Sequence, residues 1–243
     1  MTKKHELLAN NISNWIKCRV ELYGKEGIVL GLSGGIDSAV VAGLACIGDV
    51  DIMGLIMPCY SDEQDEKDAM LVAKHFNISN IKKIDLTEPY NKFIEVICSL
   101  QDFIEKDRIN PVLIGNIKAR LRMITLYHYA GLDNRLVAGT GNKCELYVGY
   151  FTKWGDGACD LLPLANILKS DVYGLAEYLN IPEQIMIKKP SAGLYPGQTD
   201  EKEMGITYNE IEDELKNIKR NLKVFNRHCN NMHKLDPIDV YKL

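Results

Sequence analysis

Residues 27–45 read GIVLGL (27–32), SGGIDS (33–38) and AVVAGLA (39–45). A short apolar run, a turn with paired glycines and an apolar segment with small residues predict a strand, a tight turn and a helix. Such a turn points backbone N–H groups and the positive end of a helix at one place, where an anion is stabilised. The stretch therefore predicts an α/β fold with an anion site after its first strand.

The SGGIDS turn carries side chains that suit a polyphosphate. Gly34 and Gly35 let the backbone approach an anion closely, and Ser33 and Ser38 add hydroxyl donors. Asp37 would repel a phosphate unless a divalent cation lies between them, so its presence predicts Mg²⁺ bound to a polyphosphate. The alternative is an ordinary strand-to-helix connection in which Asp37 caps the helix.

The turn is neither a Walker P-loop nor a dinucleotide fingerprint, because no GKS or GKT follows the glycines and GxGxxG is absent. It resembles the SGGxDS loop of the ATP pyrophosphatases, which cleave ATP between the α and β phosphates while a second substrate is adenylated. The resemblance implies that ATP is bound by Gly31, Leu32, Ser33, Gly34, Gly35, Ile36, Asp37 and Ser38.

Size and composition fit one globular domain, which we expect to span residues 1–243. The net charge of −4 argues against nonspecific nucleic-acid binding. Seven cysteines show no metal-ligand spacing and are expected to be reduced thiols. No signal peptide and no apolar run of membrane-spanning length is visible, so the expected location is the cytoplasm.

Apolar periodicity predicts strands that alternate with helices. We expect a leading helix within residues 1–26, and each strand of the first half is followed by a turn or a helix. That pattern is typical of a single-domain, doubly wound α/β fold, with a mainly parallel sheet and helices on both faces. The expected strands are 27–32, 51–57, 81–86 and 135–139, and the expected helices are 5–23, 61–76, 89–106 and 110–130.

The second half is less regular. A loop ends in a short strand at 161–164, and a helix follows at 169–179, with a second short helix after Pro182. Residues 190–206 contain two prolines and show no periodicity, so we expect a long exposed loop that acts as a lid. A capping box at Thr207 begins a C-terminal helical segment, 207–243.

A second carboxylate is expected beside the phosphate-binding turn. The strand at 135–139 runs into GTGNKCE, and ligands of parallel sheets lie at the carboxyl ends of the strands. Thr140 and Glu145 should therefore face the same crevice, with a hydroxyl for the nucleotide and a carboxylate for the metal. The alternative for Glu145 is a solvated loop acid.

Four segments together resemble the ammonia-dependent NAD synthetases, over about residues 27 to 235. They are GTGNKCE, NIKARLRM at 116–123, YFTKWGDGACDLLPL at 150–164 and PSAGLYPGQTDEKEMG at 190–205. The resemblance implies an adenine nucleotide α-hydrolase-like fold and a homodimer. It also implies that deamido-NAD is amidated to NAD through an adenylate, with free ammonia, ATP and Mg²⁺, releasing AMP and pyrophosphate.

The resemblance also implies roles for single residues. Asp37 and Glu145 would ligate Mg²⁺, and together with Lys169 they would support catalysis by positioning and charge neutralisation, with no nucleophilic side chain. Further ATP contacts would come from Thr140, Lys169 and Ser191. Contacts to deamido-NAD would come from Arg120, Lys153, Asp160, His233 and Lys234.

The residues alone leave plainer alternatives open. Arg120 borders an apolar helix stripe and could lay its stem over it, His233 could be simply exposed, and the lysines at 153, 169 and 234 could be surface lysines. A solvated face is the expectation for Lys118, Arg122, Lys188 and Lys189. Alternative functions are another adenylating amidotransferase or a transfer-RNA thiolase, or an ATP sensor without turnover, and a separate glutaminase subunit stays open.

Overall fold

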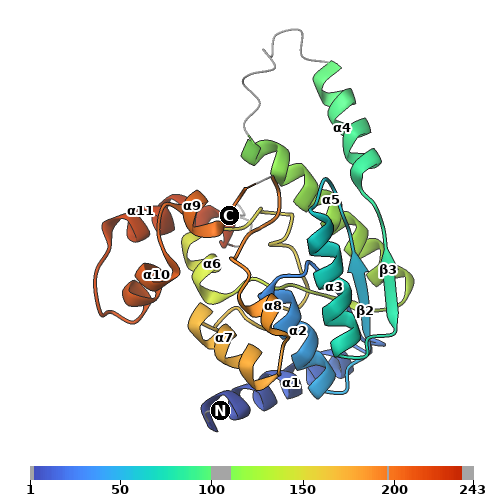
Figure 1. Ribbon diagram of the computed structural model, residues 1–243, viewed down its shortest axis with the longest axis horizontal. Coiled ribbons are helices and arrows are strands. Elements are labelled where there is room, and N and C mark those ends of the chain that lie inside the picture. The colour runs from blue at the N-terminus through green and yellow to red at the C-terminus, as the bar shows by residue number, and fades with distance from the viewer. Residues whose placement is uncertain (1–2, 100–110, 196, 237–243) are drawn as a thin grey trace, which may run out of the picture.

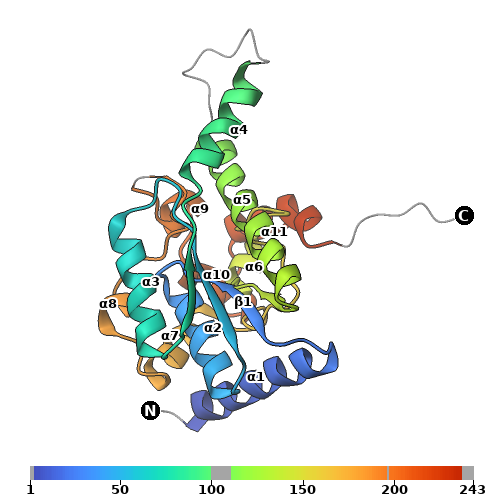
Figure 2. The same ribbon diagram turned by 90° about the vertical axis from the view of Figure 1, so that its right-hand side faces the viewer.

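The computed structural model describes residues 3–99, 111–195 and 197–236 and is built on a four-stranded parallel sheet (Figures 1 and 2). The strand order is β3-β2-β1-β4, and Ile28 of β1 is paired with Ile52 on one side and Leu136 on the other. The strands are β1 (Ile28–Gly31), β2 (Ile52–Ile56), β3 (Asn80–Lys83) and β4 (Leu136–Ala138). The chain reverses direction across the sheet between β1 and β4, so the switch point of this doubly wound fold lies there.

Helices cover both faces of the sheet. Helices α2 and α3 lie on one face, with α1 and α7 packed against α2. Helix α5 covers the other face and leads to β4 (Figure 2). The first set comprises α1 (Lys3–Leu22), α2 (Ile36–Ile47), α3 (Glu63–His75), α4 (Thr87–Ser99), α5 (Pro111–Leu132) and α6 (Lys143–Val148). The rest are α7 (Lys169–Tyr178), α8 (Glu183–Met186), α9 (Asp200–Met204), α10 (Tyr208–Leu215), α11 (Leu222–Asn231) and the 3₁₀ helix Met232–Lys234.

Strand side chains alternate between two apolar clusters. Ile28 and Leu30 pack toward α2 and α7, while Val29 between them packs with Met53 and Leu55 toward α5. A third cluster joins α6 to α10 and α11, the lobe at the left of Figure 1. The sheet is therefore buried on both faces, which leaves the carboxyl ends of its strands as the place for a ligand.

Most predicted elements are confirmed, including the capping box at Thr207. The strand expected at 161–164 is wrong, since only an isolated bridge joins Leu161 to Ala138. The segment 190–206 is not wholly an exposed loop, because it contains α9 and buries Gln198 and Asp200. Helix α6 was not predicted. The end of the expected helix 89–106 and residues 237–243 of the C-terminal segment lie outside the described residues. None of the described helices combines the length and apolar composition that crossing a membrane requires.

Candidate active site

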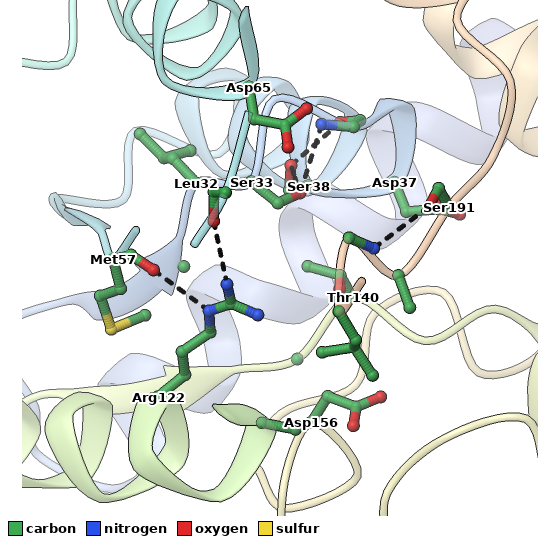
Figure 3. Close-up of a pocket in the computed structure, with 18 of the residues that line it drawn as sticks. Leu32, Ser33, Asp37, Ser38, Met57, Asp65, Arg122, Thr140, Asp156 and Ser191 are labelled. Atoms are coloured by element: carbon green, nitrogen blue, oxygen red, sulfur yellow. Dashed lines mark hydrogen bonds between the residues drawn. The ribbon is translucent and has the colours of Figure 1, made fainter. Parts of the chain in front are cut away.

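A cavity of about 310 Å³ opens at the switch point of the sheet (Figure 3). Its wall contains the turn after β1, the residues that follow β2 and β4, and residues 188–194. Thr140, Glu145 and Ser191 line it together with the turn, which confirms the expected convergence. Leu55 and Met57 make the wall near the strand ends apolar, and Ser33, Asp37 and Asp65 add polar groups.

The turn at 33–38 has the geometry of an anion site. Gly34 has φ +75°, and a Cβ on it would lie 2.6 Å from the backbone oxygen of Asp65, so only glycine fits between the turn and α3. Gly35 is the N-cap of α2 and supplies no side-chain cap, which leaves the first N–H groups of the helix open to a ligand. Asp37 does not cap α2, so the alternative role as a helix cap is wrong.

Lys169 forms ion pairs with both Asp37 and Glu145. Its Nζ lies 2.5 Å from Asp37 Oδ2 and 3.7 Å from Glu145 Oε1, and its side chain is only 3% exposed. Burial alone would lower the pKa of this lysine, but the two carboxylates raise it further than burial lowers it. Lys169 is therefore a buried ammonium held by the predicted metal ligands, and the surface-lysine alternative is wrong.

Glu145 lies in the first turn of α6, where it completes a capping box. The backbone N–H of Asn142 donates to Glu145 Oε2 at 3.1 Å, and the side-chain Nδ2 of Asn142 donates to Asp37 Oδ1 at 3.0 Å. Burial first, and then the nearby charge of Asp37, raise the pKa of Glu145. Glu145 is thus an ordered acid of the cavity wall, and the solvated loop acid is wrong.

The acidic groups here fit a magnesium ion. Asp37, Glu145 and Asp200 all line the cavity, and Asp200 Oδ1 is buried without a hydrogen-bond partner. No three metal-ligating side chains of the described residues converge closely enough to hold a cation alone. A cation at this wall would therefore need oxygens from a substrate and from water, which is how Mg²⁺ is held beside nucleotide phosphates.

Comparison with known proteins decides the family. The profile described as NAD synthase matches residues 8–241. The Carboxydothermus hydrogenoformans protein named NH(3)-dependent NAD(+) synthetase is 47% identical over 203 residues, which span 83% of this chain and 82% of the relative. The chain belongs to the NAD synthase family.

Solved structures of similar proteins share the whole architecture. The structure of NMN synthetase from Francisella tularensis matches with a TM-score of 0.90 and 42% identity, over 98% of this chain and 99% of that one. The NH3-dependent NAD synthetase from Campylobacter jejuni matches with a TM-score of 0.78 and 30% identity, over the same shares. The adenine nucleotide α-hydrolase-like fold expected for an NAD synthase is confirmed.

The residues that the NAD synthase resemblance assigns to deamido-NAD form a second cluster, which does not line the cavity. Arg120 Nη2 donates to the backbone oxygen of Lys153 at 3.2 Å, and Lys153 Nζ donates to the backbone oxygen of His233. Lys234 Nζ donates to the backbone oxygen of Gly149 at 2.7 Å. Arg120 and His233 are exposed, while Lys153 and Lys234 are half-buried.

Asp160 lies apart from this cluster. Its carboxylate accepts from the backbone N–H of Val137 in β4 at 2.8 Å and from the hydroxyl of Tyr127 at 3.2 Å. These contacts fix the edge of the sheet to α5. In this NAD synthase, the structure therefore shows a positioning role for Asp160, and its contact with a substrate stays a prediction.

Several residues of the wall were missed from the sequence. Lys118 is buried, Arg122 lines the cavity, and Lys188 pairs with two carboxylates of α3. The expectation of a solvated face is therefore wrong for these three residues. Lys189 is exposed, as expected. Gly115 and Ala119 carried the signal, because small residues four apart mark the closely packed side of a helix. Asp65, Asp156 and Asp200 also line the cavity without having been predicted.

Proposed function

We propose that this chain amidates deamido-NAD to NAD with ammonia, cleaving ATP to AMP and pyrophosphate through a deamido-NAD adenylate. The observation that carries the proposal is the carboxylate pair Asp37 and Glu145, joined by Lys169, beside the open N-terminus of α2 in one cavity. Family membership and the name of the Carboxydothermus relative support the substrate class.

The geometry suits transfer of AMP to a carboxylate. A carboxylate oxygen of the nicotinate forms a bond to the α-phosphorus of ATP as the bond to the β-phosphate oxygen breaks. The N–H groups of the turn and the hydroxyls of Ser33 and Ser38 would receive the departing pyrophosphate. Asp37 and Glu145 would hold Mg²⁺, which neutralises phosphate charge when it is bound. Ammonia then attacks the acyl carbon, and AMP leaves with the bridging oxygen.

Water must be excluded because it competes with ammonia for the acyl carbon. Residues 190–194 line the cavity, and two contacts hold this stretch in place. Lys118 Nζ donates to the backbone oxygen of Leu194 at 2.8 Å, and the Leu194 N–H donates to Gln198 Oε1 at 2.7 Å. We infer that segment 190–206 acts as the lid and that its ordered base shields the adenylate.

The Francisella relative favours a second candidate, amidation of nicotinate mononucleotide, because that protein is an NMN synthetase by name. Incubation with ATP, Mg²⁺ and ammonium, with either deamido-NAD or the mononucleotide, compares the two by kcat/KM. We expect one AMP and one pyrophosphate for each amide formed, with the higher kcat/KM on deamido-NAD. ADP and phosphate as products, or ATP binding without turnover, would reject the proposal. Turnover only with a different substrate, by ammonia-dependent amidation or by sulfur transfer to transfer RNA, would favour the alternative enzymes.

A homodimer fits the outer face of α5. Leu113, Ile124 and Leu132 are each more than half exposed on this helix, with Arg120 between the first two in sequence. Covering this face with a second copy would bury apolar surface and bring Arg120 to the subunit interface. The predicted location in the cytoplasm and the single domain stay predictions.

A further inference from the structure

Arg122 of α5 reaches into the cavity from the wall opposite the turn at 33–38 (Figure 3). Its Nε donates to the backbone oxygen of Met57 at 3.1 Å, and its Nη2 donates to Ser61 Oγ at 3.3 Å. Both acceptors are neutral, and they hold the guanidinium plane in one orientation. Nη1 has no hydrogen-bond partner among the described residues, so part of the fork is free for a ligand.

Two lysines at or beside this cavity are already neutralised by carboxylates, whereas Lys189 lines it from an exposed position. Lys169 is paired with Asp37, and Lys188 Nζ lies 2.7 Å from both Asp65 Oδ1 and Asp68 Oδ2. No carboxylate of the described chain forms an ion pair with Arg122. Burial lowers the pKa of its guanidinium, and the nearby carboxylates of Asp156 and Asp65 act on it only through longer-range attraction.

Lys118 shows the same lack of a counter-charge one helical turn earlier. It is 6% exposed, its Nζ bonds the backbone oxygen of Leu194, and it lies over the rings of Tyr60 and Tyr90. Lys118 is buried and Arg122 is half-buried, and a cation without a carboxylate partner is costly in such a place. Burial first, and then the charge of Arg122, lower the pKa of Lys118. A phosphate that enters the cavity can supply the counter-charge that the described chain does not place beside Arg122.

We propose that Arg122 binds the α-phosphate of ATP, an inference that rests on the proposed function. The α-phosphate joins the adenosine to the departing pyrophosphate. The apolar part of the wall near Leu55 and Met57 suits a purine, and the turn at 33–38 suits the pyrophosphate. Arg122 is bonded to the backbone of Met57 and faces that turn, so it lies between the expected places of the purine and the pyrophosphate. A guanidinium there reduces the repulsion between the α-phosphate and the incoming carboxylate.

Titration calorimetry with four ligands tests this contact: α,β-methylene-ATP, AMP, adenosine and pyrophosphate, all with Mg²⁺. Arg122→Met should weaken binding of the ATP analogue and of AMP by about 10- to 100-fold, as expected for a lost charge-assisted hydrogen bond. Adenosine and pyrophosphate should bind within about twofold of wild type. Arg122→Lys keeps the charge and loses the fork, so it should recover part of the loss.

Arg19→Met is the matched control, because Arg19 lies on α1 against Trp15 and outside the cavity wall. It should leave all four affinities unchanged. Unchanged AMP binding in Arg122→Met, or equal loss for all four ligands in both Arg122 variants, would overturn the proposal. Weaker binding of the nicotinate nucleotide with unchanged AMP binding would also overturn it. The failure of the proposed function looks different: wild type would bind the ATP analogue but form no amide.

Discussion

Lys169 is the side chain on which the arrangement of the carboxylates depends. It is nearly fully buried and contacts both Asp37 and Glu145, and its ammonium lies 4.9 Å from the ring centre of Tyr208. The hydroxyl of Tyr208 in turn contacts Glu145 Oε1 at 3.0 Å and Asp200 Oδ2 at 2.8 Å. The cation therefore offsets a group of acids that would otherwise repel one another, and it connects them to the segment that carries α9.

Lys169→Met should lower the free energy of unfolding by about 3–5 kcal/mol, since it leaves buried carboxylates without their counter-charge. Added Mg²⁺ should raise the melting temperature of this variant more than that of wild type, because the metal replaces the missing charge. Thermal unfolding with and without Mg²⁺ measures both effects, and Lys74→Met, at an exposed position of α3, is the control. Unfolding at the wild-type temperature would contradict the ion-pair account.

The chemistry of single residues was predictable where a local motif fixed it. Asp37 follows paired glycines at the start of a helix, so its place beside a bound anion could be inferred from the sequence alone. Arg120 and Arg122 could not be distinguished in this way. They lie two positions apart on one helix, and only the packing of α5 on the sheet decides that Arg122 enters the cavity while Arg120 stays exposed.

The turn after β1 and helix α3 form one unit. Gly34 lies against the backbone of α3, while Lys188 bonds Asp68, a side chain that Gln64 and Gln184 also contact. These contacts fix the turn to α3 and the base of the segment 190–206 to the same helix. The anion site and the base of the segment 190–206 are thus both held in place by contacts with α3.

Gly34→Ala should displace the turn, because the new Cβ would meet the Asp65 backbone oxygen at 2.6 Å in a left-handed conformation. We expect a loss of more than about 1 kcal/mol in stability and at least tenfold weaker binding of an ATP analogue. Gly131→Ala, in α5 with nothing within 4 Å, should instead stabilise the protein slightly. Calorimetry measures the binding of the ATP analogue, and denaturant unfolding measures the stability of each variant. Equal stability and equal binding in the two variants would contradict the close packing of Gly34 against α3.

Asp68 should make the free energy of unfolding depend on pH in the acidic range. Burial alone would raise the pKa of its carboxyl, but the hydrogen bonds from Lys188, Gln64 and Gln184 lower it below the ordinary value of 3.8. The stabilisation is therefore complete above that value and is lost as the pH falls through the lower pKa of the folded state. Asp68→Asn should cost about 1–3 kcal/mol at pH 7, and urea unfolding should show its gap from wild type closing below pH 3.8. A gap that stays constant with pH would contradict this.

Elements with a long periodic pattern were predictable, and short ones were not. Helix α5 extends over 22 residues and was expected, whereas α6 has 6 residues and α9 has 5, too few for a periodic signal. Helix α6 exists because Asn142 caps it, with Glu145 completing the box. The apolar stripe expected on α5 comprised Leu113, Ile117, Leu121 and Ile124; Ile117 and Leu121 pack against the core, whereas Leu113 and Ile124 are exposed. An exposed apolar side chain looks the same in sequence as a core residue.

In the whole molecule, the residues with a predicted substrate or metal role form two sets. The cavity contains the turn, the acids and Arg122, whereas Arg120, Lys153 and His233 lie in a cluster that does not line it. A second copy against the exposed face of α5 would lie beside that cluster. The proposed dimer would thus explain why residues with a predicted substrate role are exposed in one chain.

Ile124→Glu tests that arrangement, because Ile124 is 59% exposed and a carboxylate there would oppose burial at an interface. Light scattering should give twice the chain mass for wild type and the mass of one chain for the variant. The melting transition, compared at equal subunit concentration, shows whether the separated chain stays folded. Ile218→Glu, at a comparably exposed position outside α5, should leave the mass unchanged. A wild-type monomer, or a variant that stays dimeric, would reject the interface.

In the proposed reaction, the nicotinate carboxylate attacks the α-phosphorus of ATP in this cavity. Deamido-NAD labelled with ¹⁸O in that carboxylate tests it directly, because AMP that leaves an acyl adenylate carries away one carboxylate oxygen. Mass spectrometry after turnover with ATP, Mg²⁺ and ammonium should find one ¹⁸O in each AMP and none in pyrophosphate. Unlabelled AMP, or label in inorganic phosphate alongside ADP, would contradict the account.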